Sequence, residues 1–132
     1  MTEEYKQLLA DNFATLRKNI EKHKKDGDTP LIVAATKTVD AEIVNYAAEH
    51  LGLTDIGENR VQELLAKYDM LDKERLNIQF IGHLQKNKVK YLVGVVKLIH
   101  SVDSVELMQA IDKQAQKIGV VQDILLEINT GG

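Results

Sequence analysis

The sequence predicts an α/β fold built on a parallel sheet, and three observations lead to this prediction. Short apolar segments alternate with longer segments whose apolar residues recur every three or four positions, as they do on one face of a helix. After an N-terminal helix, a strand-then-helix pair occurs four times and a fifth strand follows. The first strand segment, Leu31–Ala35, is continuously apolar, as expected for a parallel strand covered on both faces. This order fits either an open doubly wound sheet or a barrel.

The N-terminal helix is expected over residues 3 to 25. Its apolar positions form one face with a period near 3.6, and they are Tyr5, Leu8, Leu9, Phe13, Leu16 and Ile20. The segment Asp26–Pro30 ends the helix, because it contains both glycine and proline. Leu31–Ala35 is then the first strand.

The remaining elements follow the same alternation. Helices are expected over Asp40–His50, Asn59–Leu71, Leu84–Val93 and from Asp103 to about Ile118. Strands are expected over Leu53–Gly57, Ile78–Ile81, Val96–His100 and Ile124–Ile128. Asn59 with Gln62, and Asp103 with Glu106, resemble capping boxes, so Asn59 and Asp103 are the expected N-caps. We expect residues 1–132 to form a single domain of about five strands, fewer than the eight strands of a closed barrel.

Composition excludes several classes of protein. The 132 residues are 44% hydrophobic and 28% charged, which is ordinary globular usage. No apolar run approaches the ~20 residues of a membrane-spanning helix, and the N-terminus does not resemble a signal peptide. There is no cysteine, and the four histidines lack metal-ligand spacing. The net charge of −3 gives no reason to expect nucleic-acid binding, so a cytoplasmic protein without metal is the expectation.

Polar residues stand just beyond the end of each expected strand. Working residues of α/β proteins gather at the C-terminal ends of the strands, so these positions are the candidate site. The candidates, in chain order, are Lys37, Asn59, His83, Ser101 and Asn129.

Lys37 is the sharpest candidate for chemistry. It directly follows an apolar strand, and apolar surroundings lower the pKa of a lysine because desolvation disfavours the ammonium. A neutral amine can attack an aldehyde and form a Schiff base. The competing interpretation is an ordinary lysine whose amine reaches water from the end of a strand.

The other candidates also have structural explanations. Asn59 could simply cap a helix, and His83 could be an exposed loop histidine. Lys86, Lys88 and Lys90 alternate within an expected helix, which favours a solvated surface. The chain contains neither a glycine-rich phosphate loop nor a Gly-x-Ser-x-Gly nucleophile turn.

Five motifs in register resemble those of one family, the pyridoxal-phosphate homeostasis proteins, which are related to the N-terminal barrel of alanine racemase. The motifs are Val33–Thr38, Asp55–Glu63, Phe80–Lys88, His100–Ser104 and Glu127–Asn129. No single motif is specific, but all five occur in the family's order across residues 31 to 129.

The resemblance implies a TIM (β/α)8 barrel with pyridoxal 5′-phosphate (PLP) at its C-terminal mouth. By carry-over, Lys37 forms the Schiff base, Asn59 lies beside the ring, and His83, Ser101 and Asn129 line the mouth. Such proteins are thought to carry and buffer the cofactor, without a robust reaction of their own. They lack the second domain that supplies alanine racemase with a tyrosine base.

Two departures from the family pattern bear on these expectations. Gln79 stands where members often have histidine. The family's three further βα units, with its phosphate-binding loop, have no counterpart in these 132 residues. We therefore expect the N-terminal part of a barrel that either self-associates through exposed sheet edges or flattens into an open sheet covered by rearranged helices. The alternatives are a racemase-like Schiff-base enzyme and a chain that binds PLP weakly or not at all.

Overall fold

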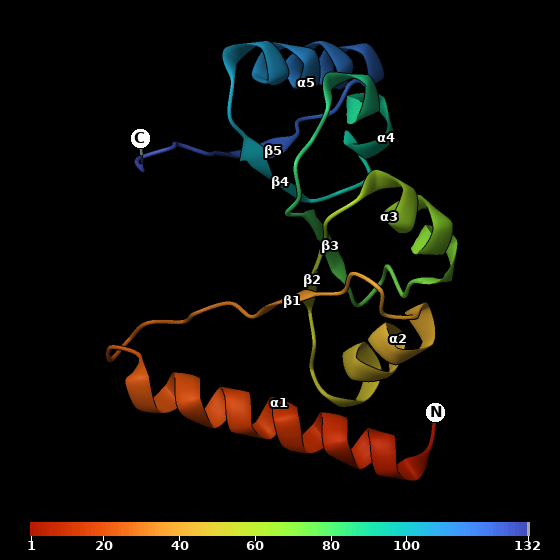
Figure 1. The fold of residues 1–132 in the computed structure, drawn as a ribbon, viewed down its shortest axis with the longest axis vertical. Helices are drawn as coiled ribbons and strands as arrows, with labels where there is room; N and C mark the ends of the chain where they lie inside the picture. Colours follow the sequence, from red (N-terminus) through yellow and green to blue (C-terminus); the bar gives the residue numbers. More distant parts are fainter. Residues whose placement is uncertain (132) are drawn as a thin grey trace.

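The computed structural model describes residues 1–131, and Figure 1 shows them as a curved parallel sheet with its connecting helices. The strands are β1 Val33–Ala35, β2 Asp55–Glu58, β3 Asn77–Phe80, β4 Leu98–Val102 and β5 Asp123–Leu126. The α-helices are α1 Glu3–His23, α2 Ala41–His50, α3 Val61–Lys67, α4 Val89–Leu92 and α5 Val105–Ile118. Two short 3₁₀ helices, η1 Tyr68–Met70 and η2 Lys86–Lys88, precede β3 and α4 respectively.

The order of the strands distinguishes the two α/β architectures. The sheet runs β1-β2-β3-β4-β5, and every neighbouring pair is parallel. A doubly wound sheet reverses its strand order and carries helices on both faces, whereas a βα barrel adds each strand on the same side of the last. Helices α2, α3 and α4 lie on one side of the sheet in Figure 1, while α1 lies across its β1 end. The sheet is therefore an arc of a barrel, as the family resemblance implied.

The hydrophobic core lies between the sheet and its helices. The strands contribute Ile56, Ile78, Phe80 and Ile99, which are at most 5% exposed. The helices contribute Val44, Leu64, Leu92, Leu107 and Ile111 to the same cluster. Because side chains alternate across a strand, the intervening residues Asp55, Gln79 and His100 lie on the opposite, inner face.

Helix α1 forms nearly over the expected residues, but its apolar face is not buried. It contains no buried residue, and Leu8 is 53% exposed. Phe13 packs partly against the core. Among the described residues, no helix combines the length and apolar character needed to cross a membrane.

Several element boundaries are shifted from the sequence-based expectation, each for a local reason. Strand β1 begins at Val33 because Val33 is the first residue paired with β2, at Asp55, which leaves Leu31 exposed. Strand β4 begins at Leu98 because the backbone N–H of Val96 still bonds to Leu92 O at the end of α4.

The helix expected over Leu84–Val93 is also shorter. Gln85 is extended, and the chain forms only a 3₁₀ turn and the four-residue α4. Gly94, at φ +80°, then turns the chain out of the helix. The expected N-cap of α5, Asp103, is wrong by one residue, because the side chain of Ser104 accepts the hydrogen bond from Leu107 N.

Candidate functional site

Lys37 lies in a tight turn directly after β1. The N–H of Val39 donates to Thr36 O at 3.1 Å, so Lys37 and Thr38 are the two central residues of the turn. Thr38 has φ +61°, a left-handed conformation that is unfavourable for a β-branched residue and costs on the order of 1–3 kcal/mol. Backbone strain therefore lies beside the candidate lysine.

The side chain of Lys37 is exposed, and within residues 1–131 its amine has no hydrogen-bond or ion-pair partner. The expectation that its stem leaves the sheet among apolar side chains is wrong for this structure. The reason is that Lys37 lies in a surface turn beyond the end of β1 and not on the strand itself.

Asn59 does not cap helix α3. The N-cap is Arg60, and no side chain makes the capping hydrogen bond there. Asn59 is half-buried, and its Oδ1 is buried without a hydrogen-bond partner among the described residues. The helix-capping explanation of Asn59 is therefore wrong, and its carbonyl oxygen is a buried acceptor without a described partner.

The loop after β3 reaches the loop after β2. A Cβ atom built on Gly82 would lie 2.0 Å from the backbone oxygen of Asn59, so only glycine fits there. His83, the next residue, is exposed. The structure therefore brings the Asn59 and His83 segments together at the C-terminal ends of β2 and β3.

Ser101 and Asn129 have contrasting environments. The sequence predicts that Ser101 lies just after a strand. It lies within β4 instead, because the strand extends to Val102. It is 6% exposed, and its Oγ has no hydrogen-bond partner among residues 1–131. Asn129 is exposed, and its Oδ1 accepts from Gly131 N at 3.0 Å.

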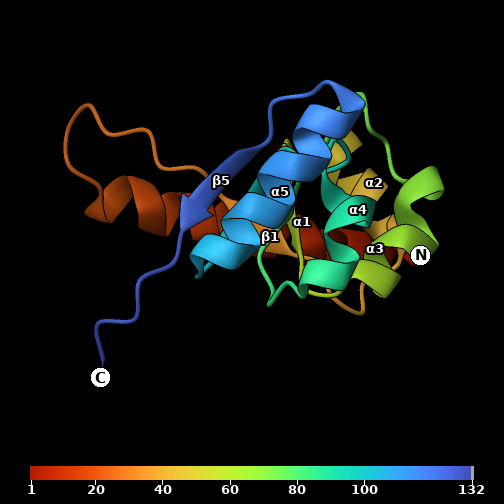
Figure 2. The same cartoon turned by 90° about the horizontal axis from the view of Figure 1, so that it is seen from above.

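The five candidates do not form one closed site. Lys37 and Asn59 follow neighbouring paired strands, since Ala35 is in register with Gly57. Asn129 follows β5, with three strands between it and β1. Figure 2 shows the segment after β5 running away from the helices.

A buried polar network next to Lys37 was missed by the sequence analysis. Glu58 is fully buried, and its Oε1 accepts from the Thr36 hydroxyl at 2.7 Å. The Nζ of Lys67 lies 2.7 Å from the same oxygen. Lys67 also donates to Thr36 O at 2.8 Å and to Val39 O at 3.0 Å. The only signal in the sequence was a second acidic residue, Glu58, at the end of the strand that begins with Asp55.

A second network crosses the inner face of the sheet. The amide nitrogen of Gln79 donates to Asp55 Oδ1 at 2.8 Å, and the Thr54 hydroxyl donates to Asp55 Oδ2 at 2.7 Å. His100 Nε2 lies 2.5 Å from Gln79 Oε1 and is the donor, because an amide oxygen only accepts. Gln79 thus links a carboxylate on β2 to an imidazole on β4.

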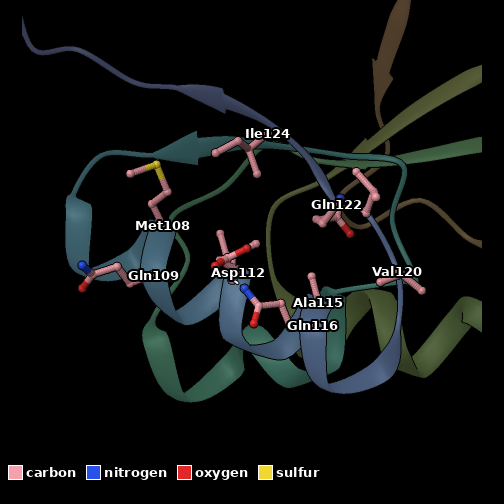
Figure 3. A pocket seen from close by; sticks show the side chains of 10 residues that line it. Met108, Gln109, Asp112, Ala115, Gln116, Val120, Gln122 and Ile124 are labelled. Atoms are coloured by element: carbon pink, nitrogen blue, oxygen red, sulfur yellow. Dashed lines mark hydrogen bonds between the residues drawn. The ribbon is translucent and has the colours of Figure 1, made fainter.

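The hollow in Figure 3 lies elsewhere, between α5 and the segment leading into β5. Its volume is about 550 Å³, and its lining includes Met108, Asp112, Ala115, Val120 and Ile124. The carboxylate of Asp112 is already bonded to Gln116. None of the five candidate residues lines this hollow, so it is separate from the strand-end site.

Comparison with known proteins places these features in a family context. The chain is 44% identical over 126 residues to the pyridoxal phosphate homeostasis protein of Aquifex aeolicus, covering 96% of this chain and 55% of that protein. It is 32% identical over 124 residues to the protein of the same name from Pseudomonas aeruginosa, covering 94% and 54%. The chain thus spans about half the length of the curated relatives it matches.

Solved structures show the same relationship. The PLP-bound structure of PipY from Synechococcus elongatus matches with a TM-score of 0.77 at 30% identity, over 92% of this chain and 54% of PipY. Its structure without PLP matches with a TM-score of 0.79. Residues 7–132 match the family model described as alanine racemase, N-terminal domain. With the sheet order and the strand-end residues described above, this match shows that the chain belongs to the alanine racemase N-terminal domain family.

Proposed function

We propose that this chain binds PLP as a Schiff base on Lys37 and serves in cofactor homeostasis rather than in turnover of a substrate. The observation that carries the proposal is the position of Lys37: an accessible amine in a strained turn, next in register to Asn59, whose buried Oδ1 has no partner among the described residues. The relatives named for PLP homeostasis and the PLP-bound PipY support the choice of ligand.

The residues present fit such a ligand. Bound PLP supplies an aldehyde carbon as an electrophile. Lys37 would hold PLP through its amine, whose two protons would leave with the aldehyde oxygen as water when C=O is replaced by C=N. Asn59 Oδ1 can accept a hydrogen bond, and Ser101 Oγ can donate or accept one, so both suit the polar substituents of a pyridine ring. His83 and Asn129 complete the proposed set.

A role without turnover fits the names of the relatives, which give PLP homeostasis and no reaction. We therefore expect no racemisation of alanine or serine by the PLP-loaded chain.

Borohydride trapping tests the proposal. The chain is mixed with PLP, the imine absorbance is recorded, and the adduct is reduced and located by peptide mapping. We expect the label on Lys37 and its loss in Lys37→Ala, whereas Lys113→Ala, which removes an exposed lysine of α5, keeps it. A label spread over surface lysines and unchanged in Lys37→Ala would refute the assignment.

A further inference from the structure

We propose that the buried Glu58–Lys67 ion pair is a positioning device for Lys37, in which Lys67 fixes both ends of the turn that carries the reactive amine. The inference rests on the proposed function, because it assigns to Glu58, Lys67 and Thr36 the task of presenting Lys37 to PLP. None of the three touches the ligand in this account.

The amine of Lys67 has three close contacts. Its Nζ contacts Thr36 O at 2.8 Å, Val39 O at 3.0 Å and Glu58 Oε1 at 2.7 Å. The two contacts to carbonyls are hydrogen bonds, and the contact to the carboxylate is an ion pair. Two of the three acceptors are the first and last residues of the turn around Lys37 and Thr38. Lys67, the last residue of α3, thereby fixes the turn at both of its ends.

The turn needs contacts from outside it, because the residue types within the turn do not favour its backbone conformation. Thr38 is the one non-glycine residue with positive φ among residues 1–131. A conformation of this kind persists only where the surrounding structure determines it. The two bonds from Lys67 and the bond from Val39 N to Thr36 O supply that determination.

Stability alone does not account for the ion pair. Glu58 is fully buried, and its Oε2 has no partner among the described residues. Desolvation of a buried pair can equal or exceed its Coulombic gain, and well-packed apolar residues often replace such pairs without loss. An apolar pair would fill the space, but it would release the carbonyls of Thr36 and Val39. The ion pair therefore has a role that an apolar pair would not fill, because Lys67 fixes the backbone on either side of Lys37.

Variants of the pair and of Thr36 separate positioning from packing. The double variant Glu58→Leu with Lys67→Met keeps the volume and removes both charges, while Thr36→Val removes only the hydroxyl bond and Thr36→Ser restores it. The control is Glu3→Gln with Lys6→Met, which removes an exposed ion pair of α1 at 3.0 Å. All are compared by the rate of borohydride trapping of PLP on Lys37, its pH profile, and the unfolding midpoint.

We expect the double variant to unfold cooperatively while trapping on Lys37 falls at least about tenfold, since small displacements of a reacting group cost factors of this size. Thr36→Val should show a smaller loss that Thr36→Ser reverses, and the control should match the wild type. Wild-type trapping rates in folded double and Thr36→Val variants would overturn the inference. If the double variant does not fold, Thr36→Val against Thr36→Ser decides.

A readout without PLP keeps this test distinct from that of the proposed function. The backbone N–H of Val39, bonded to Thr36 O, should lose hydrogen-exchange protection in the double variant, while amides of α5 keep theirs. Wild-type protein that fails to label Lys37 contradicts the proposed function. Unchanged Val39 protection in the double variant contradicts the positioning role, whatever PLP does.

Discussion

Gly82 and Asn59 are in contact through their backbones, and the contact joins the loops that follow β3 and β2. A Cβ on Gly82 would lie 2.0 Å from Asn59 O and 2.7 Å from its carbonyl carbon. Unlike a flexible side chain, a backbone carbonyl cannot rotate away from such an atom. The spacing of the two loops is therefore set by the absence of a side chain at Gly82.

Gly82→Ala should destabilise the chain by about 3 kcal/mol or more, because overpacking here moves backbone rather than side chains. It should also weaken PLP binding by displacing Asn59. Gly119→Ala is the control: Gly119 has φ +73° but nothing within 4 Å of its added Cβ. The control should lose about 1 kcal/mol, from the left-handed conformation alone. Urea unfolding measures both, and equal losses would contradict the contact.

Asn59→Ala should weaken the PLP complex with little loss of stability. Helix capping would predict a loss of about 1 kcal/mol, but Asn59 does not cap α3, and the variant removes a buried acceptor that lacks a described partner. PLP titration and chemical unfolding of the same samples separate the two effects. Full capping loss with unchanged affinity would assign Asn59 a structural role only.

The sequence predicted the elements near Lys37 better than the contacts that hold it. The strand-end position of Lys37 was readable because an apolar run stops immediately before it. Lys67 was not identified, because its partners Thr36 and Val39 are 31 and 28 positions away in the chain. A helical lysine is usually solvated, and only the fold brings this one against two carbonyls and a carboxylate.

The N-cap errors have a similar cause. Asp103 and Ser104 are both good N-cap residues, and the choice between them depends on where β4 ends, at Val102. Asn59 also suits an N-cap, but the chain continues through Arg60 in extended conformation before α3 begins. Local propensity marks these sites to within one or two residues, and strand pairing selects among them.

The difference in stability between the wild type and Asp72→Asn should become smaller at low pH. A hydrogen bond from the Arg75 guanidinium, 2.6 Å away, holds the pKa of Asp72 below its ordinary value of 3.8. A group whose folded pKa is lowered stabilises the fold above its unfolded pKa and loses that effect as pH falls through the folded pKa.

Wild type should therefore exceed Asp72→Asn in Tm at neutral pH, with the gap closing only below pH 3.8. Thermal unfolding from pH 7 to pH 3 provides the measurement. Arg75→Gln should reproduce the neutral-pH loss. A gap that widens on acidification would mean that Asp72 is not held as a carboxylate by Arg75.

The chain should self-associate through its sheet edges. Within residues 1–131, β1 and β5 each pair on one side only, so both present unpaired backbone N–H and C=O groups. Beside the β5 edge, Leu126 is 64% exposed and Ile128 is 76% exposed, and Leu31 before β1 is 61% exposed. Pairing with a second copy would satisfy the backbone groups and bury these side chains together. Light scattering over a dilution series should show a mass that rises with concentration.

A charged substitution at the β5 edge distinguishes strand pairing from nonspecific hydrophobic association. Leu126→Lys should shift the scattering curve toward monomer, because a charged side chain opposes strand addition at an edge. Leu65→Lys is the matched control, since Leu65 is 42% exposed and lies on α3, on the helix side of the sheet. The control should associate like the wild type. A chain that stays monomeric at every concentration, or one for which the two lysine variants behave alike, would show that the edges of β1 and β5 are not the contact.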